Sequence, residues 1–189
     1  SEQLILVDDV LKSLQKLAAF HRKYLGIPII ALTGSNGKTT TKELISSALS
    51  HLYNIHSTDG NLNNHIGVPL TLLQMDESTE IGVVEMGANH IGEIATLCEI
   101  ASPTHGYITN FGKAHLEGFG SESGVIKGKS ELYNYLKVRD GLIFANKDDT
   151  IQLKQIGSYK NIYTFSNYSR SSDLQLSKSL NQSFLKKCF

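Results

Sequence analysis

The segment Gly34-Ser35-Asn36-Gly37-Lys38-Thr39-Thr40 contains residue types whose spacing suits the binding of nucleotide phosphates. Glycines allow backbone N–H groups to turn inward around phosphate oxygens. Lys38 can reach the β- and γ-phosphates, and the Thr39 hydroxyl can ligate Mg²⁺. The common form of this loop has a further glycine at position 32, where this sequence has Leu32. We therefore predict a phosphate-binding loop of imperfect form; the alternative is a tight turn with an incidental Lys-Thr pair.

Glu85 is a candidate for a second magnesium ligand. It follows the apolar run at 81–84 and so should lie at the carboxyl end of a buried strand. A magnesium ion that is shared with phosphates takes its other ligands from hard oxygens such as a carboxylate. The alternative is a strand-end carboxylate in a surface loop.

Three further residues are candidates for the site, but their residue types alone do not decide their role. They are His115, Lys127 and Lys129. A single histidine in a glycine-rich loop is usually structural or solvated. The two lysines fall on a predicted helix, where a solvated pair is an equally good interpretation.

Several polar residues near the expected strand ends could touch a substrate, although asparagine is also common in turns. They are Asn61, Asn63, Asn64, Asn89 and His90, with Asn110 and Glu117 as weaker candidates.

These residues require a scaffold of alternating strands and helices. Short apolar runs predict strands at 28–33, 55–58, 81–85, 106–109, 141–145 and 161–164. Helical periodicity predicts helices at 44–52, 68–74, 91–100, 123–137 and 149–155, and an earlier one with Val10, Leu14, Leu17, His21 and Tyr24 on one face. The alternation predicts an α/β fold, a mostly parallel sheet flanked by helices in three layers. Ligands in such folds bind at the carboxyl ends of the strands.

The bulk composition favours an ordinary globular protein. Of 189 residues, 40% are hydrophobic and 19% charged, and 18 basic residues balance 18 acidic ones. This balance argues against non-specific binding to nucleic acid. The sequence shows no apolar run of bilayer length and no secretory signal, so we expect no membrane insertion and a cytoplasmic location. The two cysteines form no metal or redox motif.

With the loop written as Ala31-Leu32-Thr33-Gly34-Ser35-Asn36-Gly37-Lys38-Thr39-Thr40, the sequence resembles the Mur ligases, the ATP-dependent amide ligases of peptidoglycan synthesis. In that family position 32 is commonly not glycine. Four further segments carry the resemblance: Gly60-Asn61-Leu62-Asn63-Asn64-His65-Ile66-Gly67-Val68-Pro69, Glu85-Met86-Gly87-Ala88-Asn89-His90, His115-Leu116-Glu117-Gly118-Phe119-Gly120 and Lys127-Gly128-Lys129-Ser130-Glu131-Leu132-Tyr133. Together they are similar to the branch that adds D-alanyl-D-alanine to UDP-N-acetylmuramoyl tripeptide.

The resemblance assigns roles to individual residues. It implies that the loop binds ATP, that Thr39 holds Mg²⁺, that Glu85 bridges two magnesium sites and that His115 serves the second of them. It also implies that Lys129, rather than Lys127, is carbamylated by CO₂ and becomes an anionic metal ligand. Lys38, Glu85, His115 and Lys129 would then be the catalytic residues. The loop with Asn61, Asn63 and Asn64 would face the muramoyl substrate, with Asn89 and His90 nearby.

The resemblance also implies a domain organisation. Residues 1–26 would be a connecting segment from an N-terminal domain, and 27–165 the central ATP-binding domain. The tail at 166–189 would be either disordered or incomplete. Such a chain, expected to be monomeric, would not catalyse the full reaction alone.

Two other classes of function stay open. One is an ATP-binding module without activity. The other is a different ligase of the superfamily, such as a folate polyglutamate or cyanophycin ligase, or a small-molecule kinase, although no lid or acceptor site of a kinase is apparent.

Overall fold

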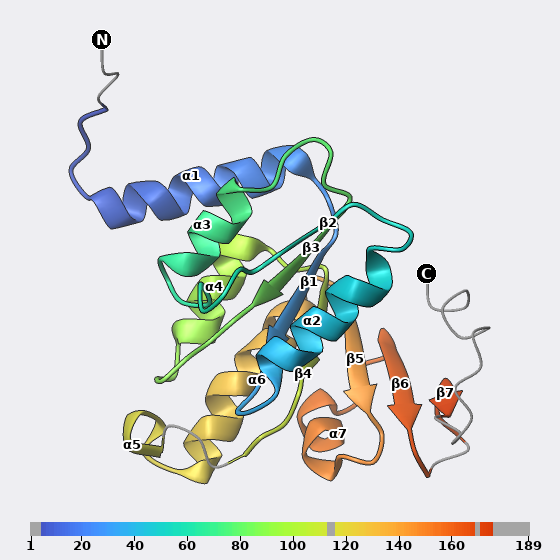
Figure 1. The fold of residues 1–189 in the computed structure, drawn as a ribbon. Helices are drawn as coiled ribbons and strands as arrows, with labels where there is room; N and C mark the ends of the chain where they lie inside the picture. Colours follow the sequence, from blue (N-terminus) through green and yellow to red (C-terminus); the bar gives the residue numbers. More distant parts are fainter. Residues whose placement is uncertain (1–4, 113–115, 169–170, 176–189) are drawn as a thin grey trace.

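The computed structural model describes residues 5–112, 116–168 and 171–175. His115, one of the predicted metal ligands, lies outside these described residues. Within them, seven parallel strands form one sheet in the order β2-β3-β1-β4-β5-β6-β7. Figure 1 shows this sheet between helices, which confirms the predicted three-layer α/β fold.

The strands in the described residues match the predicted runs closely, except for β7, which was not predicted. They are β1 (Ile29–Thr33), β2 (Ile55–Ser57), β3 (Ile81–Glu85), β4 (His105–Ile108), β5 (Leu142–Asn146), β6 (Ile162–Ser166) and β7 (Leu174–Gln175). β1 lies between β3 and β4, so the segments that follow these three strands emerge side by side at one edge of the sheet.

Helices cover the two faces of the sheet unequally. They are α1 (Val10–Leu25), α2 (Lys38–Leu49), α3 (Gly67–Leu73), α4 (Glu93–Ala101), α5 (Leu116–Phe119), α6 (Glu122–Val138) and α7 (Thr150–Ile156). The larger core cluster joins the sheet to α1, α3, α4, α6 and α7, and a smaller one joins it to α2 on the other face. None of the helices in the described part of the chain combines the length and apolarity that a bilayer crossing requires.

The burial pattern of the strands follows from this coverage. β1 and β3 are buried at every residue, because helices pack on both of their faces. β4 and β5 alternate between buried and half-buried residues. Their buried side faces α6. Tyr107 and Phe144 lie on the opposite face, where they line a shallow pocket with Thr41 and Ile45 of α2.

Two short elements were not predicted. α5 and β7 span four and two residues, which is too short to show a periodic pattern. β7 extends the sheet into the segment that the sequence had marked as a tail at 166–189.

The first helix is confirmed, but its buried face is shifted from the predicted one: Leu14 and His21 are half-buried as expected, and Val10 is exposed. Leu17 is 56% exposed and Tyr24 is 67% exposed, whereas Ala18 and Arg22 are buried. The small side chain at Ala18 suits close packing of α1 against α3 and α4. Because the helices lie this close, Arg22 donates from Nε to the Ala101 carbonyl (2.9 Å) and from Nη2 to the Ser102 carbonyl (3.1 Å).

Arg22 therefore satisfies carbonyls at the end of α4, where intrahelical partners are missing. We expect Arg22→Ala to lower the free energy of unfolding by roughly 2–4 kcal/mol, because two charge-assisted hydrogen bonds and their packing are lost. Urea titration measures the change. Arg22→Met separates the polar part from the packing, and the exposed neighbour Lys23→Ala is the control. An Arg22→Met protein as stable as the parent would contradict a role for the carbonyl bonds.

Candidate nucleotide-binding site

The predicted phosphate loop connects β1 to α2 at the carboxyl edge of the sheet. Gly34 has φ of 144° and Gly37 has φ of 76°, both in the region that disfavours side chains. A Cβ on Gly34 would lie 2.0 Å from Thr109 Oγ1 at the end of β4. The loop is glycine-dependent both in its backbone conformation and in its close approach to the neighbouring strand.

Lys38 and Thr39 open α2, directly after Gly37. Backbone N–H groups in the first turn of a helix have no intrahelical acceptor and carry partial positive charge, which suits phosphate oxygens. The Lys38 ammonium folds back and donates to the Gly34 carbonyl (3.0 Å), so it lies over the loop.

Glu85 lies at the end of β3, next to this loop, and is only 2% exposed. The Thr39 hydroxyl donates to Glu85 Oε2 (2.9 Å), and Asn63 Nδ2 donates to Oε1 (2.8 Å). The two oxygen-bearing residues predicted to hold Mg²⁺ are therefore in direct contact.

This pair fits a magnesium ion that is shared with phosphates. Mg²⁺ commonly takes only one or two protein oxygens and completes its coordination with water and substrate phosphates. Within the described residues no group of three or more His, Cys, Asp or Glu side chains could hold a metal alone. The site therefore suits an ion that arrives with a nucleotide.

The backbone of Glu85 is held by Thr58, which follows β2. The Thr58 hydroxyl accepts the Glu85 N–H (2.9 Å), and the Thr58 carbonyl accepts from Lys42 Nζ (2.5 Å). Lys42, on α2, is 1% exposed and also pairs with Glu43. Strand β2 and helix α2 thus fix the position of the carboxylate together.

Lys129 lies on α6 and is 1% exposed, whereas Lys127 is exposed. Its Nζ donates to the Ala88 carbonyl (3.2 Å) and lies 5.2 Å from the centre of the Phe119 ring. Burial lowers the pKa of Lys129 to about 8, and the charge of Lys38 adds to this effect against the opposing influence of Glu93 and Glu131. The structure thereby separates the two lysines that the sequence pattern alone could not.

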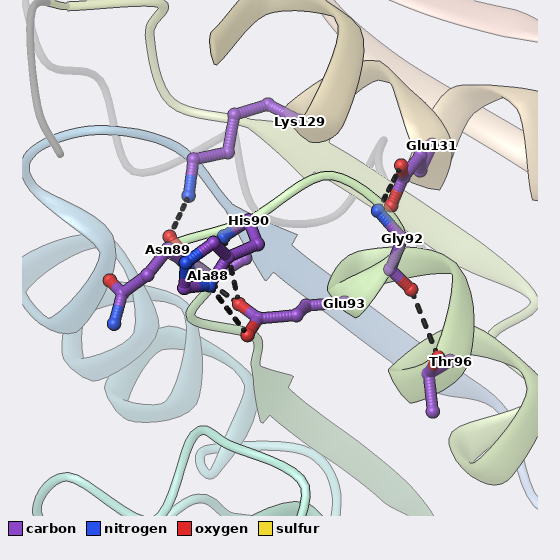
Figure 2. A network of polar contacts seen from close by, with 8 residues as sticks. All are labelled: Ala88, Asn89, His90, Gly92, Glu93, Thr96, Lys129 and Glu131. Carbon is purple, nitrogen blue, oxygen red and sulfur yellow. Dashed lines mark hydrogen bonds and ion pairs between the residues drawn. The ribbon is translucent and has the colours of Figure 1, made fainter. Parts of the chain in front are cut away.

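Figure 2 shows how the loop after β3 is tied to its surroundings. Glu93 accepts the N–H groups of Asn89 (2.6 Å) and His90 (3.1 Å), and its other oxygen pairs with the His90 ring. Those backbone bonds, together with the His90 contact, outweigh the effect of partial burial and lower the pKa of Glu93. The loop is therefore held in one shape by a carboxylate.

Glu131 on α6 fixes the same loop from the other side. It accepts the N–H of Gly92 (2.6 Å) and of Ala95 (2.9 Å), so it caps the first turn of α4 from a different helix. Lys129 and Glu131 contact the two ends of the 88–92 segment (Figure 2).

A cavity of about 670 Å³ joins several of the predicted residues. Lys38, Asn63, Asn64 and Asn89 line it. Asn61 and His90 are exposed and do not line this cavity. Asn64 also has a structural use, since its Oδ1 accepts the N–H groups of Ile66 and Gly67 at the start of α3.

Sequence patterns missed several residues of this region. Gln15 and His65 line the cavity, and Gln15 Nε2 donates to the His65 carbonyl (3.0 Å). Local sequence spacing does not predict the contacts of Thr58, Lys42 and Glu131, because their partners lie far away in the sequence or on other elements. The sequence features that could have pointed to two of them are the place of Thr58 at the end of a predicted strand and the place of Glu131 two residues after Lys129.

The weaker candidates Asn110 and Glu117 differ in their placement. Asn110 follows β4 and hydrogen-bonds to the phosphate loop through Asn36. Glu117 lies exposed on α5.

A glycine loop between a buried strand and a helix, with a carboxylate on the adjacent strand, defines an α/β domain of the P-loop type. The family described as the Mur ligase middle domain matches residues 32–187. The chain belongs to this family.

Relatives and solved structures agree with that assignment. The chain is 47% identical over 149 residues to the UDP-N-acetylmuramoyl-tripeptide–D-alanyl-D-alanine ligase of Bacillus subtilis, covering 79% of this chain and 33% of the relative. It is 39% identical over 171 residues to the ligase of the same name from Escherichia coli, covering 89% and 38%. The MurF ligase of Thermotoga maritima in complex with ADP has a TM-score of 0.80 at 34% identity, covering 89% of this chain and 39% of that one. The chain thus spans about a third of the length of these curated relatives.

The capping contact of Glu131 can be tested by stability. We expect Glu131→Ala to lower the free energy of unfolding by about 1 kcal/mol, because two N–H groups at the start of α4 lose their acceptor. Thermal unfolding followed by circular dichroism measures it. The matched control is Glu99→Ala, which removes a carboxylate that pairs with Arg139 on the surface. Equal losses for the two variants would show that Glu131 acts only as a surface charge.

Proposed function

We propose that the chain is the ATP-binding central domain of a ligase that joins D-alanyl-D-alanine to UDP-N-acetylmuramoyl tripeptide. The observation that carries the proposal is the contact of Thr39 at the phosphate loop with the buried carboxylate of Glu85. The named relatives and the cavity beside Lys38 support the choice of substrate.

The chemistry requires activation of a carboxylate, because an amine cannot expel oxide from it. Transfer of the γ-phosphoryl group of ATP to the carboxylate of the muramoyl tripeptide gives an acyl phosphate. The amine of D-alanyl-D-alanine then attacks this carbonyl, and phosphate leaves through a tetrahedral intermediate.

The charge of each residue suggests its role in this reaction. Lys38 neutralises phosphate charge, and the first-turn N–H groups of α2 bind phosphate oxygens. Thr39 and Glu85 would hold one Mg²⁺, while His115 and carbamylated Lys129 would serve a second. Bound Mg²⁺ supplies charge stabilisation to the phosphoryl group during transfer. Asn63 orients the Glu85 carboxylate, and Asn64 and Asn89 present polar groups to the cavity.

The environment of Lys129 suits carbamate formation. The neutral amine attacks the carbon of CO₂, a C–N bond forms, one C=O π bond opens to a carboxylate oxygen, and the nitrogen releases a proton. Only the neutral amine is nucleophilic, and a pKa of about 8 makes it far more abundant near neutral pH than in an ordinary lysine.

Phosphate release provides the first test. A polypeptide that carries this chain with its flanking domains should release phosphate from ATP only with both UDP-N-acetylmuramoyl tripeptide and D-alanyl-D-alanine present. Lys38→Ala should lower kcat/KM by about a thousandfold or more, because charge on the transferring phosphoryl group loses its counterion. Lys127→Ala, at an exposed lysine, is the control. An active Lys38→Ala enzyme would refute the role of the loop, and activity with another amine substrate in place of the dipeptide would refute the branch.

Carbamylation of Lys129 makes a separate prediction. Between pH 7 and pH 8 the neutral amine rises from about a tenth to about a half of the total, so the initial rate of carbamate formation should rise about fivefold at fixed dissolved CO₂. Native mass spectrometry and ¹³C NMR with labelled bicarbonate measure it.

The matched variants are Lys129→Arg, which stays cationic, and Lys129→Ala. Both should lose about a hundredfold or more in kcat, since a charged ligand is missing. Dissolved CO₂ should stimulate only the parent enzyme. A parent without the added mass of CO₂ and without a response to bicarbonate would contradict the carbamate.

A further inference from the structure

The phosphate loop is fastened at its apex to the segment that follows β4. The Asn110 carbonyl accepts the Ser35 N–H (3.1 Å), and the Asn110 side chain accepts the Asn36 N–H through Oδ1 (3.2 Å). Its Nδ2 donates back to the Asn36 carbonyl (2.9 Å). One side-chain amide therefore bonds both polar backbone groups of a single loop residue.

Neighbouring residues reinforce this contact. The Thr109 hydroxyl donates to the same Asn36 carbonyl (2.6 Å), and the Ser35 hydroxyl donates to the Gly112 carbonyl (2.8 Å). Gly34 allows the approach, because any Cβ there would collide with Thr109.

These bonds determine which N–H groups of the loop face a phosphate. The N–H groups of Ser35 and Asn36 are directed to Asn110. The N–H groups of Lys38, Thr39 and Thr40 belong to the first turn of α2 and have no intrahelical acceptor. The N–H groups of the first turn are therefore better placed for a phosphate than those of Ser35 and Asn36, and the apex of the loop supports them.

An amide is the side chain that this support requires. It offers a donor and an acceptor on one planar group, as a backbone strand partner does. A carboxylate of the same shape can accept the Asn36 N–H but repels the Asn36 carbonyl, and it places negative charge beside bound phosphates. A methyl group supplies neither bond.

We propose that Asn110 is a positioning residue for nucleotide binding, which holds Asn36 so that the loop keeps its phosphate-binding shape. This inference rests on the proposed nucleotide-binding function of the loop. A loop fixed in its binding conformation loses less conformational freedom when the ligand binds.

The variants Asn110→Ala and Asn110→Asp test the proposal, with Asn161→Ala as the matched control. Asn161 Nδ2 also donates to a backbone carbonyl, that of Asp140 (2.7 Å), but it precedes β6 at the opposite edge of the sheet. Isothermal titration with Mg²⁺-ATP gives the affinity of each protein, and thermal unfolding gives its stability. Steady-state kinetics of the polypeptide with its flanking domains give KM for ATP and for D-alanyl-D-alanine.

We expect the Kd for Mg²⁺-ATP to rise about tenfold to a hundredfold in Asn110→Ala, from the loss of two hydrogen bonds. Asn110→Asp should bind more weakly still. KM for ATP should rise in parallel, while KM for D-alanyl-D-alanine stays within about twofold, a split that general destabilisation would not produce.

The outcomes separate this inference from the proposed function. A parent protein that does not bind Mg²⁺-ATP overturns both. A parent that binds, with Asn110 variants that bind within about twofold of the Asn161→Ala control, overturns the role of Asn110 alone. If Asn110→Ala does not fold, Asn110→Asp keeps the shape of the side chain, and an affinity equal to that of the parent would decide against the proposal.

Discussion

The site depends on the burial of one carboxylate, that of Glu85, at the end of the all-buried strand β3. A buried anion is unfavourable unless hydrogen bonds or cations compensate it. Thr39 and Asn63 each donate to one of its oxygens, and Thr58 holds its backbone. These partners come from α2, from the 60–66 loop and from the end of β2. The requirement to satisfy one carboxylate therefore brings three separate segments to the same point.

The placement of Lys129 is a second consequence of burial. An ammonium group enclosed with a carbonyl and an aromatic ring is less stable than in water, which lowers its pKa. The same α6 carries Glu131, which fixes the loop that supplies the Ala88 carbonyl. A buried amine with a lowered pKa and the segment beside it are thus positioned by one helix, which favours precise placement of both.

Sequence patterns predicted the central strands well because β1 and β3 are continuous apolar runs followed by polar residues. They also placed Gly34 to Thr40 and Glu85 at one edge, since parallel strands end together. They could not choose between Lys127 and Lys129 by physics alone, because burial depends on the packing of α6. They predicted the buried face of α1 only in part, because Arg22 is buried through hydrogen bonds to the carbonyls of residues far along the chain. The pairing of Asn110 with Asn36 likewise has no local signal.

Gln15 lines the cavity, so α1 contributes to the candidate site. Its sequence suggested a mere connection, yet its side chain reaches the backbone of His65 beside the asparagine loop. Arg22, two turns further along, fixes the same helix to the end of α4, whose first turn adjoins Asn89 and Gly92. Both ends of α4 are therefore held by other helices, α6 at its start and α1 at its end. Helix α1 therefore contacts the cavity directly through Gln15 and supports it indirectly through α4, which lines the same cavity.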